Sequence, residues 1–393
     1  MIRHICTVSM VAVLVLVPWG CGDFDSNRLV APGDEARLTD DPGIKVMSQN
    51  LYLGVDLGTL FSGDLATALG QLQATTALDA TAPSAGPRRL RAIAEQVVAE
   101  QPHLVGLQEV TTFEFTFADG SQAVLDFQAV LQGWLDYLHY VAGVSEHTYH
   151  WVVNPLIDAP PIDLPVLGGI QVRYLDADAI LVRDDVWPTV SDVVVEPFEA
   201  VATFDVFGSE FVSTRGWEAV TTEVAGQEVV FVNTHLEVQA YEAVQMAQAE
   251  ELIAFMKVQD LPVIAVGDFN SAANHDAPAD QYTGSYQLFR DAGYADLWLR
   301  QSRSVDGLTC CQAGDLTDPE PLLHSRLDLV LVDWNPAGFG GQSDMYVVGE
   351  EPGDRIAFTA VTIFGDGPFP LALWPADHAG VVATLWPARG RMQ

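Results

Sequence analysis

The sequence predicts a two-sheet α/β sandwich, and two observations support this fold class. From Ile44 onward, short apolar runs that end at turns alternate with amphipathic stretches of helical period, as expected when buried strands and helices follow one another. No internal repeat or low-complexity tract interrupts this pattern, which excludes a solenoid. Hydrophobic residues make up 49% and charged residues 18% of the 393 residues, a composition typical of a chain that packs a core.

The individual elements follow from the apolar pattern. Buried strands are predicted where apolar runs are bounded by turn residues, at 44–51, 104–110, 179–182, 229–234, 263–266, 327–332 and 380–385. Helices are predicted at 87–100, where Leu90, Ile93 and Val97 recur at helical spacing, and at 125–138 and 241–258. Glycine-containing turns at 207–209 and 225–227 predict two hairpins.

The first 43 residues differ in texture from the rest of the chain. Arg3, a short apolar run at 8–17 and Gly20 before Cys21 predict a signal peptide over residues 1–20, and the apolar run is too short to span a bilayer. The Gly20-Cys21 junction resembles a bacterial lipoprotein cleavage site, but Pro18-Trp19 departs from that pattern, so simple secretion stays open. Residues 21–43 are expected to be a tether and 44–388 one folded domain, placed outside the cytoplasm and either membrane-anchored through a lipidated Cys21 or secreted.

Charge and cysteine content narrow the classes of function. The formal net charge of -35 and the lack of a basic run disfavour tight nonspecific binding to nucleic acid, because phosphate-backbone affinity normally comes from Lys and Arg. Apart from Cys6 and Cys21, the only cysteines are the adjacent Cys310 and Cys311, for which a vicinal disulfide and two free thiols are both open. No cysteine spacing of the zinc-binding type is present.

Polar residues stand at the ends of several predicted strands, where a core element tolerates them poorly. Any one of them is most simply an ordinary loop residue, but strand ends converge at the rim of a sheet, so the whole set indicates a shared site. The set is Asn50, Glu109, His235, Asp268 with Asn270, Asp328, and Asp377 with His378.

In their order and context, the segments around these residues resemble the endonuclease/exonuclease/phosphatase superfamily over nearly the whole domain. The segments are Ser48-Gln49-Asn50-Leu51, Leu107-Gln108-Glu109-Val110, Asn233-Thr234-His235-Leu236-Glu237, Gly267-Asp268-Phe269-Asn270-Ser271, Arg326-Leu327-Asp328 and Ala376-Asp377-His378-Ala379-Gly380-Val381. Each short segment alone is weakly specific for the family, whereas the six segments in this order are a strong signal for it. The resemblance implies a four-layer αββα sandwich of two mixed, mainly antiparallel sheets flanked by helices, and a Mg²⁺-dependent catalytic domain, with Mn²⁺ as a second possible metal.

The resemblance also implies a role for each polar group near the metal and the water. Glu109 would bind the metal and Asp377 would lie near it or its water shell, since Mg²⁺ takes carboxylate and phosphate oxygens. Asn50 would fix Glu109 or a phosphate oxygen by hydrogen bonding. Asp268 would orient or deprotonate the attacking water, and Asn270 would donate to the phosphate as charge shifts.

The two histidines are expected to have carboxylate partners that fix their tautomers. By the resemblance, Asp328 pairs with His378, whereas His235 polarises the phosphate or protonates the leaving oxygen and pairs with Asp176, with Asp178 as the competing choice.

Two further residues are candidates for phosphate contact. Arg215 is one, with an ordinary ion pair as its plain alternative. Tyr174 is the other, with a packed rim tyrosine as its alternative.

The predicted function is hydrolysis of a phosphate ester, most simply a phosphodiester. The substrate class stays open between a small molecule, a lipid headgroup and a nucleic acid, because loops rather than the fold set specificity. A lipid phosphodiesterase of sphingomyelinase or phosphoinositide type would use the apolar stretch 154–169 as a hydrophobic lip, whereas the plainer interpretation is a loop that covers the core. A catalytically silent surface lipoprotein is the other alternative, and no protein partner is predicted.

Overall fold

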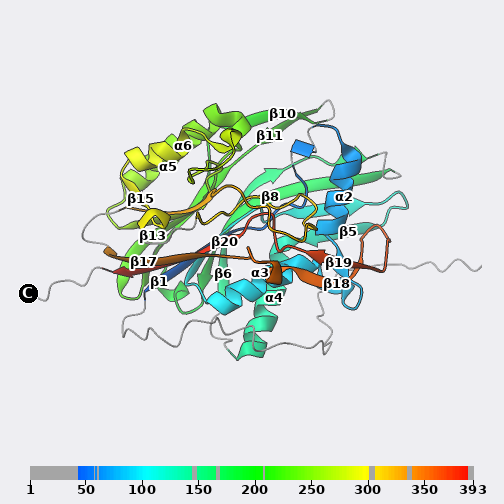
Figure 1. Ribbon diagram of the computed structural model, residues 1–393, viewed down its shortest axis with the longest axis horizontal. Coiled ribbons are helices and arrows are strands. Elements are labelled where there is room, and N and C mark those ends of the chain that lie inside the picture. Colours follow the sequence, from blue (N-terminus) through cyan, green and yellow to red (C-terminus); the bar gives the residue numbers. More distant parts are fainter. Residues whose placement is uncertain are drawn as a thin grey trace, which may run out of the picture.

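The computed structural model describes residues 43–56, 58–59, 62–143, 148–164, 169–206, 209–300, 306–333 and 339–387. The predicted signal peptide, Cys21 and all but the last residue of the predicted tether lie outside the described residues. Within them, the chain forms a mixed α/β fold in which strands lie between helices on opposite sides (Figure 1). No helix among the described residues has both the length and the apolar character needed to cross a membrane.

The larger sheet has nine strands and contains both termini of the folded part. Its order is β17-β20-β1-β3-β8-β4-β5, with β6 and β7 also paired to β8. The β1–β3 pair is parallel and its other pairs are antiparallel. The strands are β1 (Ile44–Asn50), β3 (Leu104–Gln108), β4 (Thr112–Thr116), β5 (Gln122–Asp126), β6 (Tyr149–Asp158), β7 (Ile162–Leu164), β8 (Ile170–Arg183), β17 (Phe339–Val348) and β20 (Gly380–Pro387).

The second sheet has six strands in the order β15-β16-β14-β13-β12-β9, with β13 and β14 parallel. Its strands are β9 (Asp192–Pro197), β12 (Gly216–Val224), β13 (Gln227–His235), β14 (Val263–Asp268), β15 (Tyr294–Asp296) and β16 (Asp328–Asp333). A hairpin of β10 (Ala202–Val206) and β11 (Ser209–Ser213) stands apart, as does a small sheet of β2 (Leu78–Asp79), β18 (Ile356–Val361) and β19 (Phe369–Leu373).

The helices cover the outer faces of the two large sheets (Figure 1). The α-helices are α2 (Leu65–Thr75), α3 (Arg88–Glu100), α4 (Phe127–Ala142), α5 (Glu242–Lys257) and α6 (Ser285–Asp291). The short 3-10 turns are η3 (Pro83–Ala85), η6 (Trp187–Thr189), η7 (Gln239–Tyr241), η8 (Ala279–Gln281), η9 (Trp298–Arg300) and η10 (Pro352–Asp354).

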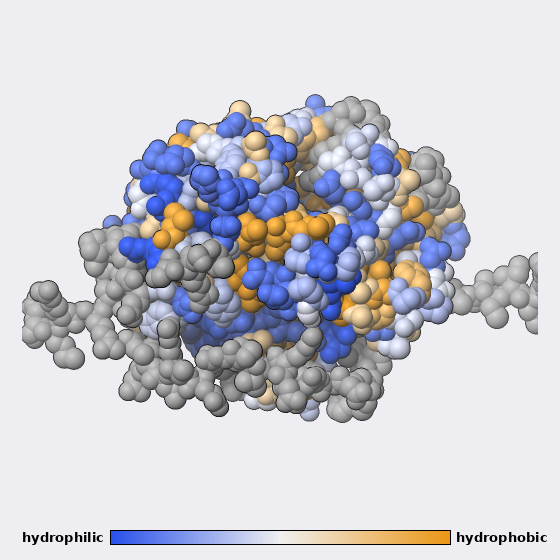
Figure 2. Space-filling model, in the orientation of Figure 1, coloured by the Kyte–Doolittle hydropathy of each residue, from blue (hydrophilic) through white to orange (hydrophobic). Residues whose placement is uncertain are grey.

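Three large apolar clusters hold these layers together. In β13, Val229 and Phe231 lie in the cluster between the sheets, whereas Val230 and Val232 lie in the cluster under α5 and α6. Side chains alternate along a strand, so β13 is buried on both faces and its sequence is a continuous apolar run. The third cluster joins the nine-stranded sheet to α2, α3 and α4. Figure 2 shows a largely hydrophilic face crossed by a band of apolar residues.

All seven predicted strands and three predicted helices are present, with ends that differ by a few residues. The predicted strand 179–182 is the end of the much longer β8, and the predicted helix 125–138 begins two residues later and continues to Ala142. Both predicted hairpins exist, and at the second the positive φ angles of Ala225 and Gly226 match a tight hairpin turn.

The expectation of a loop or lip over 154–169 is wrong for most of that stretch. Within its described residues, it forms the end of β6 and all of β7, both paired with β8. The apolar residues of these strands therefore belong to the nine-stranded sheet, and contact of this stretch with a membrane stays a prediction.

A buried polar network joins the two sheets below their rim. Asn233 on β13 donates from Nδ2 to a carboxylate oxygen of Glu218 on β12 and, at 3.0 Å, to the carbonyl oxygen of Leu107 in the other sheet. Gln108 donates back to Oδ1 of Asn233 at 2.6 Å. Burial raises the pKa of Glu218 to about 8, so this carboxyl holds a proton in the folded chain at neutral pH.

Glu218→Gln is expected to remove one pH-dependent contribution to stability. The folded-state pKa of about 8 lies above the ordinary value of 4.5, so the folded chain binds more protons than the unfolded chain between these values, and stability falls as pH rises. One such proton contributes up to about 1.4 kcal/mol per pH unit. The free energy of unfolding of wild type and variant is measured by denaturant titration at pH 5 and pH 8. Relative to wild type, the variant should be more stable at pH 8 than at pH 5. A pH-independent difference contradicts this prediction.

Candidate active site

Strand register brings the predicted polar residues to one edge of the two sheets. In the parallel pair β1–β3, Asn50 lies opposite Gln108, so Glu109 follows directly at the same edge. In the second sheet, His235 lies opposite Asp268 and Asp268 lies opposite Asp328. Because the carboxyl ends of parallel strands meet at one edge, side chains far apart in sequence become neighbours there.

Asn50 connects the two halves of this cluster. Its Nδ2 donates to Glu109 Oε1 at 3.2 Å and to Asp268 Oδ2 at 3.3 Å, and its Oδ1 accepts from the backbone N–H of Tyr52 at 2.8 Å. All these groups are buried. The predicted contact of Asn50 with Glu109 is present, and the amide also holds the water-activating candidate Asp268.

Two site residues adopt left-handed backbone conformations that end their strands. Glu109 has φ 57° and Asn270 has φ 49°, a region that non-glycine residues seldom occupy and that is enriched at functional sites. The turn at Glu109 directs its other carboxylate oxygen to the backbone N–H of Leu53, and its own N–H donates to Asp178 at 3.3 Å. Asn270 donates from its backbone to Asp268 Oδ1 at 2.9 Å and from its amide to the carbonyl of Leu236 at 2.9 Å.

His378 and Asp328 form the predicted pair. The ring Nδ1 of His378 lies 2.7 Å from Asp328 Oδ2, and its Nε2 lies 3.7 Å from Asp268 Oδ2. Although burial alone would lower it, the pKa of His378 is raised well above its usual range by the charges of Asp328, Asp268 and Asp377. This imidazole is therefore positively charged at neutral pH.

The second histidine, His235, is neutral, unlike His378. His235 Nδ1 faces Arg215 Nη1 at 2.9 Å, and because a guanidinium only donates, this nitrogen accepts and Nε2 carries the proton. The Nε2 atom lies 3.6 Å from Asp268 Oδ2. Burial, then Arg215 and His378, holds the pKa of His235 well below its usual range. His235 is thus a neutral N–H donor beside Asp268.

The predicted pairing of His235 with Asp176 is wrong, and the competing residue Asp178 is its neighbour. Asp178 Oδ1 lies 3.9 Å from His235 Nδ1, whereas Asp176 accepts from the hydroxyl of Thr111 at 2.9 Å and bonds to the hydroxyl of Tyr174. Both carboxylates lie on one face of β8, so alternation alone could not distinguish them. Burial raises the pKa of Asp176 to about 7 and that of Asp178 well above its usual range.

The candidate phosphate-contacting residues, buried Arg215 and partly buried Tyr174, both have protein partners. Besides its contact with His235, Arg215 has its Nε 4.0 Å from Glu237 Oε1. The ring of Tyr174 packs 5.7 Å from that of Phe113, and burial followed by the Asp176 charge raises its pKa well above 10. Arg215 therefore donates a hydrogen bond to His235, a contact that the sequence did not indicate.

The oxygen donors around Glu109 fit a hard divalent cation. Burial, followed by the charges of Glu109 and Asp268, raises the pKa of Asp377 to about 7 even though His378 opposes the rise. Asp377 Oδ1 is buried without a hydrogen-bond partner. Negative charge gathered around unsatisfied carboxylate oxygen is the environment that Mg²⁺ neutralises, so Glu109, Asp377 and Asn50 are the candidate ligands.

A second set of possible metal ligands, Asp268, Asp328 and His378, offers donor atoms within 4.8 Å of one another. We assign this set to proton handling, because its imidazole nitrogen is already bonded to Asp328 and because Mg²⁺ prefers oxygen ligands.

Arg89 is a site residue that the sequence did not reveal. It is fully buried at the start of α3 and donates to the backbone carbonyls of Leu51, Tyr52, Thr75 and Pro375. These bonds fix the turn after β1 and the segment before Asp377. Its position beside Leu90, on the apolar side of the predicted helix, was the signal in the sequence that this arginine is buried.

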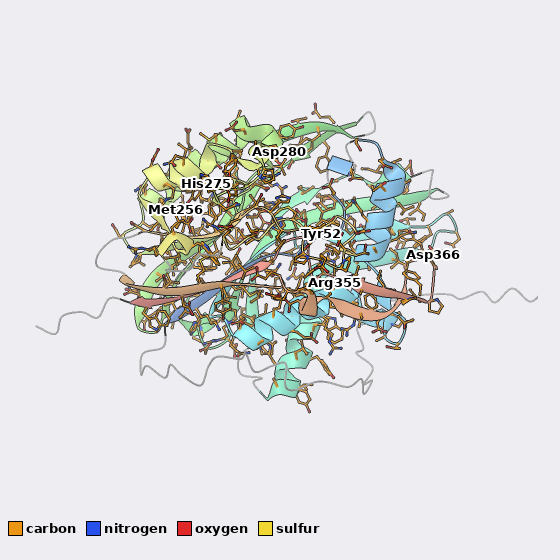
Figure 3. The ribbon with its side chains drawn as sticks, in the orientation of Figure 1. Tyr52, Met256, His275, Asp280, Arg355 and Asp366 are labelled. Atoms are coloured by element: carbon orange, nitrogen blue, oxygen red, sulfur yellow. A yellow bond between two sulfur atoms is a disulfide. The ribbon has the colours of Figure 1, made fainter. Side chains whose placement is uncertain are left out.

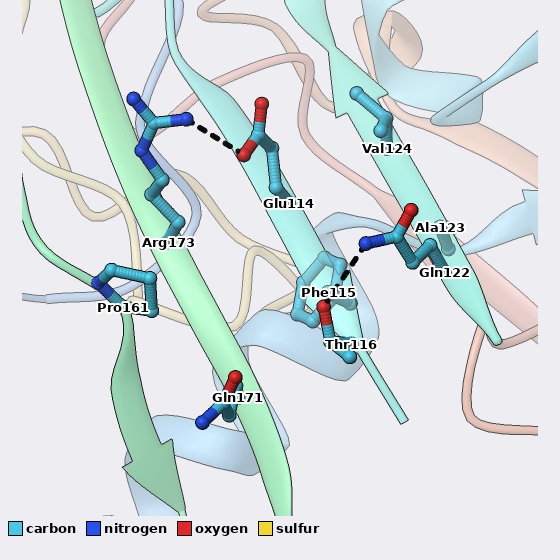
Figure 4. Close-up of a pocket in the computed structure, with 9 residues that line it drawn as sticks. All are labelled: Glu114, Phe115, Thr116, Gln122, Ala123, Val124, Pro161, Gln171 and Arg173. Atoms are coloured by element: carbon cyan, nitrogen blue, oxygen red, sulfur yellow. Dashed lines mark hydrogen bonds and ion pairs between the residues drawn. The ribbon is translucent and has the colours of Figure 1, made fainter. Parts of the chain in front are cut away.

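Other candidate groups lie away from the cluster. His275 is exposed and pairs with Asp276, and Figure 3 shows it toward α5, whereas Tyr52 lies near the middle of the molecule. A pocket of about 460 Å³ between β4, β5 and β8 contains none of the site residues. Its charged residues are already paired, since Arg173 lies 3.0 Å from Glu114 (Figure 4). Arg173 also lies 2.7 Å from Asp158. This pocket offers no catalytic group.

A mixed α/β protein that gathers carboxylates, amides and two imidazoles at one sheet edge has the site of a hydrolase. The sequence model of the endonuclease/exonuclease/phosphatase family matches residues 47–378, and the chain belongs to this family. The members named in that description all cleave phosphoester bonds. No curated protein matches the sequence.

Solved structures share this fold at low sequence identity. An endonuclease/exonuclease/phosphatase family protein from Leptotrichia buccalis C-1013-b has a TM-score of 0.51 and 14% identity, covering 87% of this chain and 99% of its own. A mannosyl-6-phosphatase from Bacteroides thetaiotaomicron VPI-5482 has a TM-score of 0.48 and 19% identity, with 87% and 99% covered. Truncated TDP2 from Caenorhabditis elegans has a TM-score of 0.45 and 16% identity, covering 87% of this chain and 97% of its own. The likeness to the Leptotrichia buccalis protein, at 14% identity, shows the fold alone.

Proposed function

We propose that the chain is a divalent-metal-dependent hydrolase of phosphate esters that acts on phosphodiesters outside the cytoplasm. The observation that carries this proposal is the position of Asp268, which lies 3.6 Å from His235, 3.7 Å from His378 and 3.3 Å from Asn50. One carboxylate thus faces a neutral imidazole, a charged imidazole and the amide that also binds Glu109. This arrangement supports activation of water beside a bound phosphate.

The chain's own residues divide the chemistry between them. Burial raises the pKa of Asp268 to about 6, which brings it closer to the working range of a general base. Neutral His235 donates its Nε2–H to a phosphate oxygen or to the leaving oxygen, and the amide of Asn270 has a second N–H for the phosphate. Charged His378, held by Asp328, stabilises negative charge as it moves onto the phosphate.

Glu109, Asp377 and Asn50 would hold the metal, with Mg²⁺ as the proposed ion and Mn²⁺ as a substitute. When bound, the cation supplies Lewis-acid stabilisation of phosphate charge. The substrate is proposed to be compact rather than polyanionic, because Arg215 is committed to His235 and the chain carries a formal charge of -35.

The proposal is tested with a substrate panel. Purified protein would be incubated with bis(4-nitrophenyl) phosphate, 4-nitrophenyl phosphate, sphingomyelin, a phosphoinositide and DNA, each with Mg²⁺, Mn²⁺ or excess EDTA. We expect metal-dependent turnover of a diester and little turnover of DNA. Turnover that EDTA leaves unchanged would contradict the metal assignment. A lack of turnover with every substrate and metal would favour a silent binding protein.

Glu109→Gln should raise the Mg²⁺ concentration needed for half-maximal activity by about tenfold or more, because one anionic oxygen ligand is lost. The measurement is initial rate against Mg²⁺ concentration at saturating substrate. Glu114→Gln is the matched control, since Glu114 is a neighbouring glutamate that pairs with Arg173 outside the cluster. An unchanged Mg²⁺ requirement in Glu109→Gln removes this residue from the ligand set.

A further inference from the structure

The adjacent cysteines lie beside the catalytic histidine and are joined by a disulfide. The sulfur atoms of Cys310 and Cys311 and a ring nitrogen of His378 all lie within 4.8 Å of one another. Cys310 is buried, with 1% of its surface exposed, whereas Cys311 is partly exposed. One sulfur of the disulfide therefore faces the protein interior and the other is closer to solvent.

The backbone on both sides of the disulfide is bonded to the Asp328–His378 pair. Thr309 Oγ1 accepts from the backbone N–H of Asp328 at 3.1 Å, and the Thr309 carbonyl accepts from the N–H of Ala379 at 2.8 Å. On the other side, the N–H of Gln312 donates to the Asp377 carbonyl at 2.8 Å. The four-residue segment 309–312 thus contacts the chain next to Asp328 and on either side of His378.

The disulfide segment is also hydrogen-bonded to the segment that precedes Asp328. The N–H of Cys310 donates to the Ser325 carbonyl at 2.8 Å, and the Cys310 carbonyl accepts from the N–H of Ser325 at 2.8 Å. A disulfide between adjacent residues closes a small ring and restricts the backbone between them. The restriction is therefore transmitted to the segments that position both members of the pair.

We propose that the Cys310–Cys311 disulfide is a thiol-exchange site whose redox state sets the position of His378 relative to Asp328 and Asp268. A thiolate of a low-molecular-weight thiol attacks Cys311 Sγ, the S–S bond breaks, and Cys310 leaves as a thiolate that takes up a proton. A second thiol then attacks the mixed disulfide and releases Cys311 as a thiol. Two external thiols are oxidised to one disulfide as the protein disulfide is reduced.

Reduction should lower catalysis without removing any catalytic group. Cys310 and Cys311 act as positioning residues, because their contacts reach Asp328 and His378 through backbone hydrogen bonds. Displacement by about 1 Å can cost about a hundredfold in rate, since proton transfer depends on geometry. Asn50 and Glu109 hydrogen-bond to each other and to the backbone of Tyr52 and Leu53 rather than to segment 309–312, so we expect kcat to fall by about tenfold or more while KM changes little.

The experiment compares oxidised and dithiothreitol-reduced wild-type protein with the double variant C310S/C311S, using bis(4-nitrophenyl) phosphate and saturating Mg²⁺. Mass spectrometry after alkylation should show two new thiols in native reduced protein, and reoxidation should restore kcat. C310S/C311S should have the low kcat in both conditions, which also controls for metal binding by dithiothreitol. If the double variant does not fold, C311A, which keeps the buried Cys310, replaces it.

The kinetic arm rests on the proposed function, so a second readout is independent of turnover. The ring resonance of His378 in ¹⁵N-histidine-labelled protein should shift on reduction, whereas that of His150, which pairs with Asp184, should not. Resistance of the native disulfide to thiols, full kcat after confirmed reduction, or an unchanged His378 resonance would each overturn the proposal. If neither redox state hydrolyses any substrate, the proposed function fails and the His378 resonance alone decides the redox proposal.

Discussion

Asp268→Asn is expected to lower kcat by about 10²- to 10⁴-fold, a loss typical of removing a general base. The amide has nearly the same shape, so the bonds that Asp268 accepts from Asn270 at 2.9 Å and Asn50 at 3.3 Å can be partly kept. What is lost is the negative charge between His235 and His378. The variant should therefore bind substrate and metal almost normally but turn over slowly.

The measurement for this variant is kcat at saturating Mg²⁺ and substrate, with thermal unfolding to check the fold. Asp280→Asn is the matched control, because Asp280 is an exposed aspartate in the short turn η8. It should keep the wild-type rate. If Asp268→Asn retains more than about a tenth of the wild-type kcat, Asp268 is not the base.

His378→Ala and Asp328→Asn are expected to lower kcat by about 10²- to 10⁴-fold each and to be strongly non-additive. The two side chains form one unit, with Nδ1 and Oδ2 2.7 Å apart, so removing either partner disables the other. The double variant should have nearly the same rate as His378→Ala alone.

A double-mutant cycle on kcat checks this pairing, with the unfolding free energy of each variant measured alongside. His150→Ala is the matched control, since His150 forms a similar 2.7 Å pair with Asp184 at the surface. Full multiplicative losses in the double variant would show that Asp328 and His378 act independently.

Much of the fold and the set of site residues could be predicted because their signals are local. The strands buried on both faces are continuous apolar runs, and their polar ends at Asn50, Glu109 and Asp268 stand out against that background. The pairing of Asp328 with His378 was also predicted correctly. The mixed α/β fold with flanking helices is confirmed.

The remaining features depend on contacts between distant segments. Asp176 and Asp178 have the same alternation on β8, and only the placement of Thr111 and His235 determines which carboxylate faces which group. The contact of Arg215 with His235 depends likewise on the pairing of β12 with β13. The strands β5, β6 and β7 lie in short or mixed stretches where polar and apolar residues carry little periodic signal, and β4 alternates over only five residues.

The location of β20 determines when the site can be assembled during synthesis of the chain. Among the described residues this strand is the last, yet it inserts between β1, the first, and β17. His378 directly precedes it, whereas Asn50 directly ends β1. Until β20 has paired with β1 and β17, His378 is not held beside Asp328 and Asp268, so the site is complete only after the first and last described strands have met.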